Sequence, residues 1–360
     1  MKVIGIMSGT SMDGTDLSLC DIQENNGQWT AEIISSKTYP MEEKWRVRLS
    51  QLKYQNSATY ARTDVFYGRY LGELVKLFIQ EQGVEADLIA SHGHTIFHDP
   101  EGWLTGQVGD GATLSAVAEL PVVSNFRRAD VAKGGQGAPL AGKGDELLYA
   151  EYDACLNLGG FCNISAQLDG QRSAWDIGPC NIVLNRLARE RNLKYVAYGS
   201  IASEGQIDFT LLEQLNQIEY YHKTGAKSLG REWINKNFWH IVRDFEKTDV
   251  ADRMKTLVVH ISFQIARALD QSFGNNGEGK KILVTGGGVF NKILMEFITQ
   301  ESDATFVIPE ENIVNYKEAQ FFALLGAMRI KNQTNIDHHQ TGASASQIAG
   351  SLDGDFSKIK

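Results

Sequence analysis

The chain has 360 residues, of which 42% are hydrophobic and 22% charged, and these values exclude a wholly disordered or collagen-like chain. Asp and Glu (44) outnumber Lys and Arg (35), so the net charge of −9 disfavours binding to nucleic-acid backbones or anionic membranes. No stretch approaches the roughly 20 apolar residues of a membrane span, and the N-terminus becomes polar too soon for a secretory signal. We therefore expect a cytoplasmic protein whose 4 cysteines are reduced.

The N-terminal part predicts an antiparallel meander followed by helix. Residues 3–7, 16–21 and 30–39 have strand-like composition, and an Asn-Asn-Gly turn separates the last two segments. Apolar residues then recur at helical spacing over residues 42–82. A short buried strand is expected at 88–91, closed by a polar turn that begins at the next residue.

The C-terminal part repeats this organisation. Three short strands joined by glycine turns are expected between Ala154 and Gly178. Helical patterns and two further strands follow, the second strand covering 305–308. The predicted helices are 181–191, 209–221, 250–273 and 316–330, and a strand at 281–285 ends in three glycines.

Two such halves, each beginning with a glycine-bearing hairpin, predict a duplicated α/β fold. This is the plan of the hexokinase, actin and heat-shock ATPase group, with two domains around a central cleft. We expect residues 1–127 plus 331–360 to form the N-terminal domain and residues 128–330 the second. In this plan both hairpins approach the phosphates of a nucleotide, because glycine turns let backbone N–H groups point at an anion.

The first hairpin, at residues 7–16, has the composition of a phosphate-binding turn. Gly9 and Gly14 permit a tight turn, while hydroxyl and backbone N–H groups around them can bind phosphate oxygens. Asp13 or Asp16 can hold Mg²⁺ through water. An ordinary hairpin turn is the alternative, because turns use the same residue types for their own backbone geometry.

Two polar segments are candidates for binding a small ligand. The His92-x-His94 spacing invites a metal interpretation, but no cysteine or acidic pair stands beside it, so hydrogen bonding to a sugar is preferred. In 125–140, an arginine pair, an aspartate and a Gly-Gly-x-Gly loop can clamp an anionic ligand. A flexible surface loop is the alternative there.

Asp176 stands at the end of a predicted strand, before a Gly-Pro turn. A carboxylate at this place can act as a general base, and a helix-capping or turn-stabilising aspartate is the equally weighted alternative. Gly286–Gly288 link a strand to a helix and can receive a phosphate or an adenine ring. Their spacing is not G-x-G-x-x-G, which disfavours a dinucleotide-binding fold.

Taken together and in this order, the motifs resemble the anhydro-N-acetylmuramic acid kinase family over nearly the whole chain. That family has the duplicated hexokinase-like fold and forms homodimers. It uses Mg-ATP to cleave the 1,6-anhydro bond of its sugar while phosphorylating O6, in bacterial cell-wall recycling. The matching motifs begin at Met7, Ser91, Gly106, Asn125, Leu156, Asp176, Lys227, Val284, Glu318 and Thr341.

The resemblance implies roles for individual residues. Asp176 would be the base that activates a water to attack the anomeric carbon, and Glu318 matches a second family acid. Asp13 would hold Mg²⁺ through water. The implied ATP site comprises Gly9, Thr10, Ser11, Asp13, Gly14, Thr15, Asp16, Gly159, Gly178, Gly286, Gly287 and Gly288. The implied sugar pocket comprises His94, Thr95, Arg127, Asp130, Gly135, Gln136, Gly137, Ala138 and Pro139.

Several positions depart from the usual family motifs, and they motivate a second hypothesis. The altered positions are Ile177 for Thr, Cys180 for Gly, Asn185 for Asp, His94 for Gln, Asn125 for Asp and Val196 for Asp. The second hypothesis is a weakly active or non-catalytic homologue that binds nucleotide and sugar. A third is a glycosidase with Asp176 and Glu318 as paired carboxylates, which the glycine motifs disfavour.

Overall fold

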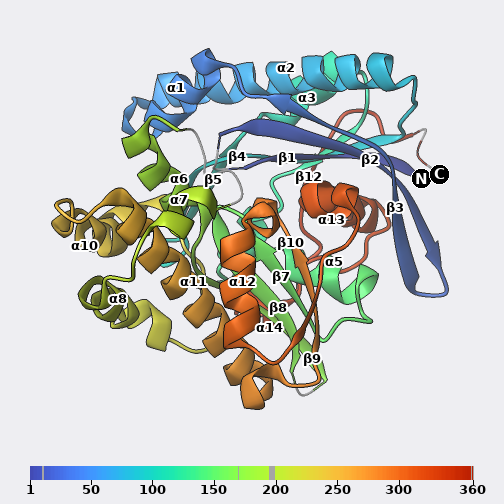
Figure 1. Cartoon of the computed structure of the whole chain (residues 1–360). Helices are drawn as coiled ribbons and strands as arrows, with labels where there is room; N and C mark the ends of the chain where they lie inside the picture. The colour runs from blue at the N-terminus through green and yellow to red at the C-terminus, as the bar shows by residue number, and fades with distance from the viewer. Residues whose placement is uncertain (10–11, 169, 194–198, 358, 360) are drawn as a thin grey trace. The chain divides into compact units, whose positions relative to one another are not determined.

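The computed structural model describes residues 1–9, 12–168, 170–193, 199–357 and 359 (Figure 1). The chain forms two compact units, which we call unit 1 (Met1–Leu148 with Tyr316–Lys360) and unit 2 (Tyr149–Asn315). The boundaries expected from the sequence were wrong in two segments. Residues 128–148 and 316–330, expected in the second domain, belong to unit 1.

Unit 1 is built on a sheet of order β12-β6-β4-β1-β2-β3, with β5 paired to β4. The first three strands form the expected antiparallel meander, while β4 runs parallel to β1 and β6 parallel to β4. The strands are β1 (Lys2–Ser8), β2 (Gly14–Asn25), β3 (Gln28–Pro40), β4 (Leu88–Asp99), β5 (Leu104–Val108), β6 (Val122–Ser124) and β12 (Ser351–Asp353).

The sequence of the long helix of unit 1, α2 (Ser57–Gln82), explains why this segment is helical and where it begins and ends. Tyr67, Leu71, Val75 and Phe78 recur at helical spacing and are buried. The Asn56 side chain caps its first turn, and Gly83 ends it in the left-handed conformation, with φ 62°. The other helices of unit 1 are α1 (Glu43–Gln51), α3 (Gly111–Ala118), α4 (Arg128–Val131), α5 (Ala141–Leu148), α14 (His338–Thr341) and the part of α13 (Glu311–Ile330) after Asn315.

Unit 2 has a sheet of order β11-β10-β7-β8-β9, and α11 (Val250–Phe273) packs against β8 and β9. The strands are β7 (Ala154–Leu158), β8 (Phe161–Leu168), β9 (Gln171–Pro179), β10 (Lys281–Thr285) and β11 (Thr305–Val307). The remaining α-helices are α6 (Asn181–Ala188), α7 (Ser200–Glu204), α8 (Phe209–Asn216), α9 (Arg231–Trp233), α10 (Trp239–Asp244) and α12 (Lys292–Glu301).

The two sheets share one topology. In unit 1 the strands β3-β2-β1-β4-β6 follow the order that β9-β8-β7-β10-β11 follow in unit 2. In each, three antiparallel strands are joined by two parallel strands beside the first. The duplicated α/β fold of the hexokinase and actin group is thereby confirmed.

Two local predictions were wrong. β4 does not end before His92 but continues to Asp99, because β5, which we did not predict, pairs with its second half. Helix α13 begins at Glu311 rather than at 316. Glu318 therefore lies in the interior of the helix.

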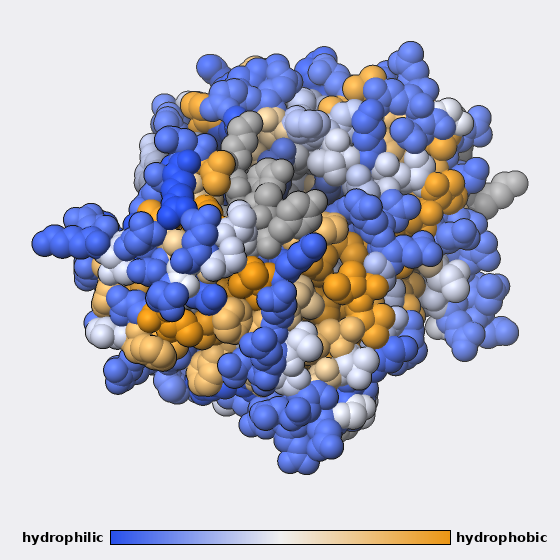
Figure 2. Space-filling model, in the orientation of Figure 1, coloured by the Kyte–Doolittle hydropathy of each residue, from blue (hydrophilic) through white to orange (hydrophobic). Residues whose placement is uncertain are grey.

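The described helices include none that is both long enough and apolar enough to cross a membrane. Hydrophilic residues predominate on the face shown in Figure 2, with smaller groups of apolar residues between them. Phe209 and Trp103 are the most exposed aromatic side chains in the described ranges after Tyr54, at 74% and 68%.

Candidate functional site

The β1–β2 hairpin of unit 1 forms a compact turn. Met7 pairs with Asp16 at its base, and the N–H of Met12 donates to the carbonyl of Gly9. A Cβ at Gly14 would lie 2.6 Å from the methyl carbon of Thr38 on β3, so a side chain does not fit there. Thr10 and Ser11, both predicted to bind phosphate, lie outside the described residues.

Asp16 is the most perturbed carboxyl group of this hairpin. Burial raises its pKa to about 7, and the negative charges of Asp13 and Glu318 act in the same direction. The hydroxyl of Thr38 donates to Oδ1 of Asp16 at 2.6 Å and opposes the shift. The charges of Asp13 and Glu318 thus both act on Asp16 in unit 1.

Glu318 projects from α13 with part of its surface in solvent. The protein atoms packed around it nevertheless raise its pKa, whereas the positive charges of Arg127 and Lys317 lower it. Lys317 itself is buried in an ion pair with Asp145, at 3.1 Å. Sequence reasoning missed this pair, since its members are 172 residues apart and stand in no motif.

Arg127 is held by two acceptors in unit 1. Its Nε donates to Nε2 of His92 at 2.9 Å, and its Nη1 donates to the carbonyl of Gly137 at 2.5 Å. Nδ1 of His92 lies 2.9 Å from the carbonyl of Gly93. Burial and the neighbouring Arg127 hold the pKa of His92 well below its ordinary value, so His92 is neutral and accepts from the arginine.

Asp130 organises the glycine loop from inside. It is fully buried, its Oδ2 accepts the N–H of Gly137, and its Oδ1 accepts the hydroxyl of Thr341 at 2.6 Å. The N–H of Gln136 donates to the carbonyl of Thr341. A Cβ at Gly135 would collide with the Asp130 carboxylate. The loop, which ends at the cis peptide bond between Ala138 and Pro139, is thus tied to the Thr341 motif.

The histidine segment lies beside the hairpin. His94 is buried, and its Nδ1 lies 3.1 Å from the hydroxyl of Ser8, which is also 2.7 Å from the hydroxyl of Tyr67. Thr95 accepts a long hydrogen bond from Gln107. Within the described ranges, the one group of three residues that could hold a metal ion is Asp337, His338 and His339, far from this segment in sequence.

In unit 2, the main chain holds Asp176. The N–H of Leu229 donates to Oδ2 of its carboxylate at 2.7 Å, and its own N–H donates to the carbonyl of Lys227. The hydroxyl of Tyr220 donates to its carbonyl oxygen at 2.7 Å. A β-bulge at Ile177 interrupts the pairing of β9 with β8 immediately after Asp176. Bulges of this kind re-aim neighbouring side chains and recur at active sites.

The glycine motifs of unit 2 meet at the end of β7. A Cβ at Gly286 would lie 2.5 Å from Oδ1 of Asn157, and one at Gly288 would lie 2.5 Å from Cβ of Leu158. A Cβ at Gly287 would meet nothing within 4 Å, so its backbone is open to a ligand.

The two other glycine motifs join this cluster. The N–H of Asn181 donates to the carbonyl of Gly159, and the Asn181 side chain donates to the carbonyl of Leu158. A Cβ at Gly178 would lie 3.1 Å from the ring of Tyr221. The hydroxyl of Thr285 is buried and has no hydrogen-bond partner among the described residues. An open glycine turn next to an unpartnered buried hydroxyl fits a polar ligand such as a nucleotide.

A sequence profile described as anhydro-N-acetylmuramic acid kinase matches residues 1–354. The chain belongs to this family. It is 31% identical to the anhydro-N-acetylmuramic acid kinase of Francisella tularensis subsp. novicida and 32% identical to that of Legionella pneumophila strain Philadelphia 1, with 97% of each chain covered. Component A of (R)-2-hydroxyglutaryl-CoA dehydratase from Acidaminococcus fermentans is a solved structure that aligns over 92% of this chain and 99% of its own, at 11% identity and a TM-score of 0.45.

The family departures that the structure describes lie mainly around Asp176. Ile177 is the bulged residue, and Cys180 is buried where the chain enters α6. Val196 lies outside the described residues. Sequence reasoning missed Leu229 and Tyr220, which hold Asp176, although the family motif beginning at Lys227 marked their neighbourhood.

Proposed function

We propose that this family member is an ATP-dependent kinase that opens the 1,6-anhydro ring of anhydro-N-acetylmuramic acid and yields N-acetylmuramic acid 6-phosphate and ADP. The observation that carries the proposal is the position of Asp176, whose carboxylate is oriented by a backbone N–H beside a β-bulge. The match to the family over residues 1–354 supports the substrate class.

In the proposed reaction, Asp176 accepts a proton from a water as that water attacks the anomeric carbon. The bond between the anomeric carbon and O6 breaks, and O6 takes the γ-phosphoryl group while ADP leaves. The N–H of Leu229 holds one carboxylate oxygen, which orients the base. Positioning of this kind supplies much of the rate in phosphoryl transfer and in general base catalysis.

The remaining predicted residues have supporting roles in this proposal. Asp13 and Asp16 would hold Mg²⁺ through water, and the bound ion would neutralise charge on the phosphate oxygens. The backbone of the hairpin and of Gly286–Gly288 binds the nucleotide. Arg127, fixed by His92, and the loop shaped by Asp130 bind the sugar. Glu318, with its raised pKa, is the second acid of the site.

A coupled ADP-release assay tests the proposal. We expect ADP only when the anhydro sugar is present, and no ADP with the ordinary N-acetylated amino sugars. A non-catalytic homologue would bind both ligands without releasing ADP, and a glycosidase would open the ring in the absence of ATP. The comparisons with known proteins do not favour either alternative.

Two further properties stay predictions. A homodimer is expected from the family resemblance, and analytical ultracentrifugation of the purified protein tests it. A cytoplasmic location is the second prediction, and fractionation of the source cells tests it.

A further inference from the structure

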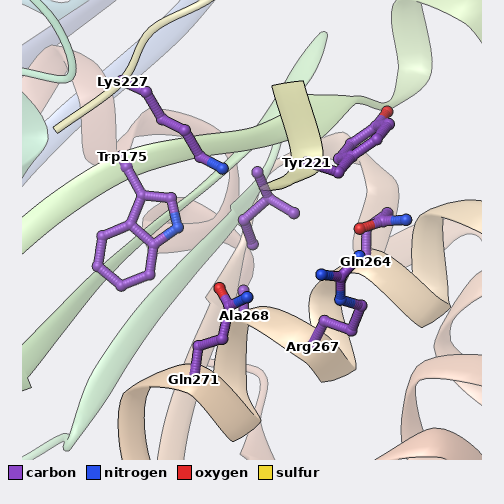
Figure 3. A pocket seen from close by; sticks show the side chains of 8 residues that line it. Trp175, Tyr221, Lys227, Gln264, Arg267, Ala268 and Gln271 are labelled. Atoms are coloured by element: carbon purple, nitrogen blue, oxygen red, sulfur yellow. The ribbon is translucent and has the colours of Figure 1, made fainter. Parts of the chain in front are cut away.

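A small pocket in unit 2 lies against the strand that carries Asp176. Trp175 and Ile177 of β9 line one side, Tyr221 and Lys227 a second, and α11 a third (Figure 3). The residues from α11 are Gln264, Arg267, Ala268 and Gln271. No role proposed above uses this pocket.

Polar groups converge on the pocket. In Figure 3 the ammonium of Lys227, the indole nitrogen of Trp175, the guanidinium of Arg267 and the amide of Gln271 point towards its middle. All of these groups can donate hydrogen bonds. Two of them, Lys227 and Arg267, are cations, and charge-assisted hydrogen bonds from cations suit an anion.

The two charged side chains in the lining of the pocket, Lys227 and Arg267, are both positive. No carboxylate forms an ion pair with Lys227 or Arg267 in the part of the chain that the structure describes. Burial lowers the pKa of Lys227 to about 8, and the positive charges of Arg267 and Lys223 act in the same direction. The negative charge of Asp176 opposes this shift only in part. Bringing an oxyanion between the two cations would relieve this repulsion.

Lys227 is preorganised for such a ligand. Its Nζ donates to the carbonyls of Lys223 and Tyr220, at 2.8 and 3.2 Å, and lies 4.7 Å from the centre of the Tyr220 ring. An ammonium group has three N–H donors, so one remains for a ligand. Gln264 is likewise fixed, since its Nε2 donates to Asn216.

We propose that this pocket binds a small oxyanion, phosphate or carboxylate, between Lys227 and Arg267. Its occupancy is coupled to Asp176, because the segment from Lys227 to Leu229 contributes to the pocket at one end and bonds the Asp176 carboxylate at the other. The coupling, though not the binding, rests on the proposed function of Asp176 as the base.

Titration calorimetry with inorganic phosphate tests the binding. We expect one site in the wild-type protein, and roughly tenfold or greater weakening in both Arg267→Gln and Lys227→Met, because each removes a charge-assisted hydrogen bond. Arg243→Gln removes an exposed arginine outside the pocket and should leave the affinity unchanged. Acetate in a parallel titration distinguishes a carboxylate site from a phosphate site.

Two further titrations test whether this site is distinct from the nucleotide site and whether it depends on the charge of Lys227. Phosphate should still bind when a non-hydrolysable ATP analogue saturates the protein. Sulfate, which does not titrate near neutrality, should bind more weakly as the pH rises through about 8, because Lys227 loses its charge while Arg267 keeps it. The other charged or titratable groups near Lys227 are Lys223, Asp176, Tyr220 and Tyr221.

Displacement of phosphate by the ATP analogue, or unchanged affinity in both pocket variants, would overturn the proposal. A separate assay tests the coupling. We expect phosphate to change the rate of ADP release in the wild-type protein, and we expect no such change in Arg267→Gln. A protein that binds phosphate here but releases no ADP would contradict the proposed function and leave the oxyanion site standing. If phosphate binds here and ADP is released at a rate that phosphate does not alter, the coupling is wrong.

Discussion

The two units use one topology to hold carboxylates in opposite ways. In unit 1, Asp16 accepts a side-chain hydroxyl and lies near two other acids, so burial and charge raise its pKa to about 7. In unit 2, Asp176 accepts a backbone N–H. The charged form of Asp16 is destabilised, which suits a carboxylate whose charge a bound cation would compensate. Asp176 is oriented by the main chain, as suits a base that must keep one position.

The largest expected effect tests the carboxylate of unit 2. Asp176→Asn should lower turnover by about 10²–10⁴-fold, because the amide cannot accept the proton of the attacking water. ATP binding should be nearly unchanged, as measured by calorimetry. Asp244→Asn, which changes an exposed aspartate of the same unit, is the matched control. Retention of half the wild-type rate would move the base elsewhere, with Glu318 as the next candidate.

The second prediction concerns the buried link between Asp130 and Thr341. Thr341→Val keeps the shape of the side chain but removes the hydroxyl that Asp130 accepts, leaving a buried carboxylate oxygen unpaired. We expect a loss of about 1–3 kcal/mol in the free energy of unfolding, measured with urea, and a raised KM for the sugar. Thr341→Ser keeps the hydroxyl and should recover most of the loss. Equal effects of Val and Ser would show that the hydrogen bond contributes little.

The third prediction tests the carboxylate of unit 1. The folded pKa of Asp16 lies above the ordinary value of 3.8, so the folded state binds more protons than the unfolded state between about pH 4 and 7. The contribution of Asp16 to stability therefore falls as the pH rises through that window. Without nucleotide or Mg²⁺, Asp16→Asn should be more stable than the wild type by about 1–2 kcal/mol at pH 8, and the gain should vanish near pH 4.

Binding completes the test of Asp16. Mg²⁺ should strengthen nucleotide binding to the wild type and should do so less in Asp16→Asn. The wild-type response to Mg²⁺ should increase as the pH rises through 7, because the cation requires the deprotonated carboxylate. An Asn variant that is less stable than the wild type at pH 8 would show that the charge of Asp16 is already compensated.

The sequence predicted elements and motifs better than it predicted long-range contacts. Residues 250–273 and 281–285 were predicted as helix and strand with the bounds that α11 and β10 have, because periodicity and glycine turns are local. β5 was missed because its polar Thr105 and Gln107 do not predict a buried strand, although both are buried in the structure, where β5 pairs with β4. The placement of 128–148 and 316–330 depends on long-range contacts such as the hydrogen bond from Thr341 to Asp130 and the one from Gln320 to the carbonyl of Ala31.

The candidate site shows the same limit. Glycine and aspartate positions could be predicted, because turn conformations and charges restrict the residue type. The hydrogen bond from the N–H of Leu229 to Asp176 could not be predicted. Every residue except proline has a backbone N–H donor, so the residue type at position 229 does not indicate this bond. The raised pKa of Asp16 likewise depends on burial by the folded chain, to which the charge of Glu318 on another element adds.

The smallest expected effect concerns the support behind β9 in unit 2. Nε2 of the buried His260 lies 2.9 Å from the hydroxyl of Tyr221, and its Nδ1 lies 2.7 Å from Oδ1 of Asn216. Burial lowers the pKa of His260 to about 3, so the ring is neutral, donates to Asn216 and accepts from Tyr221.

Tyr221→Phe keeps the ring that packs against Gly178 but removes the hydroxyl that donates to His260. This change should lower the free energy of unfolding by about 1 kcal/mol at pH 7. Tyr54→Phe, at a tyrosine that is 76% exposed, should cost nothing measurable. The hydrogen bonds described for Asp176 come from residues other than Tyr221, so the turnover of Tyr221→Phe should stay near that of the wild type. A loss of turnover as large as that of Asp176→Asn would show that the base depends on Tyr221 as well as on the main chain.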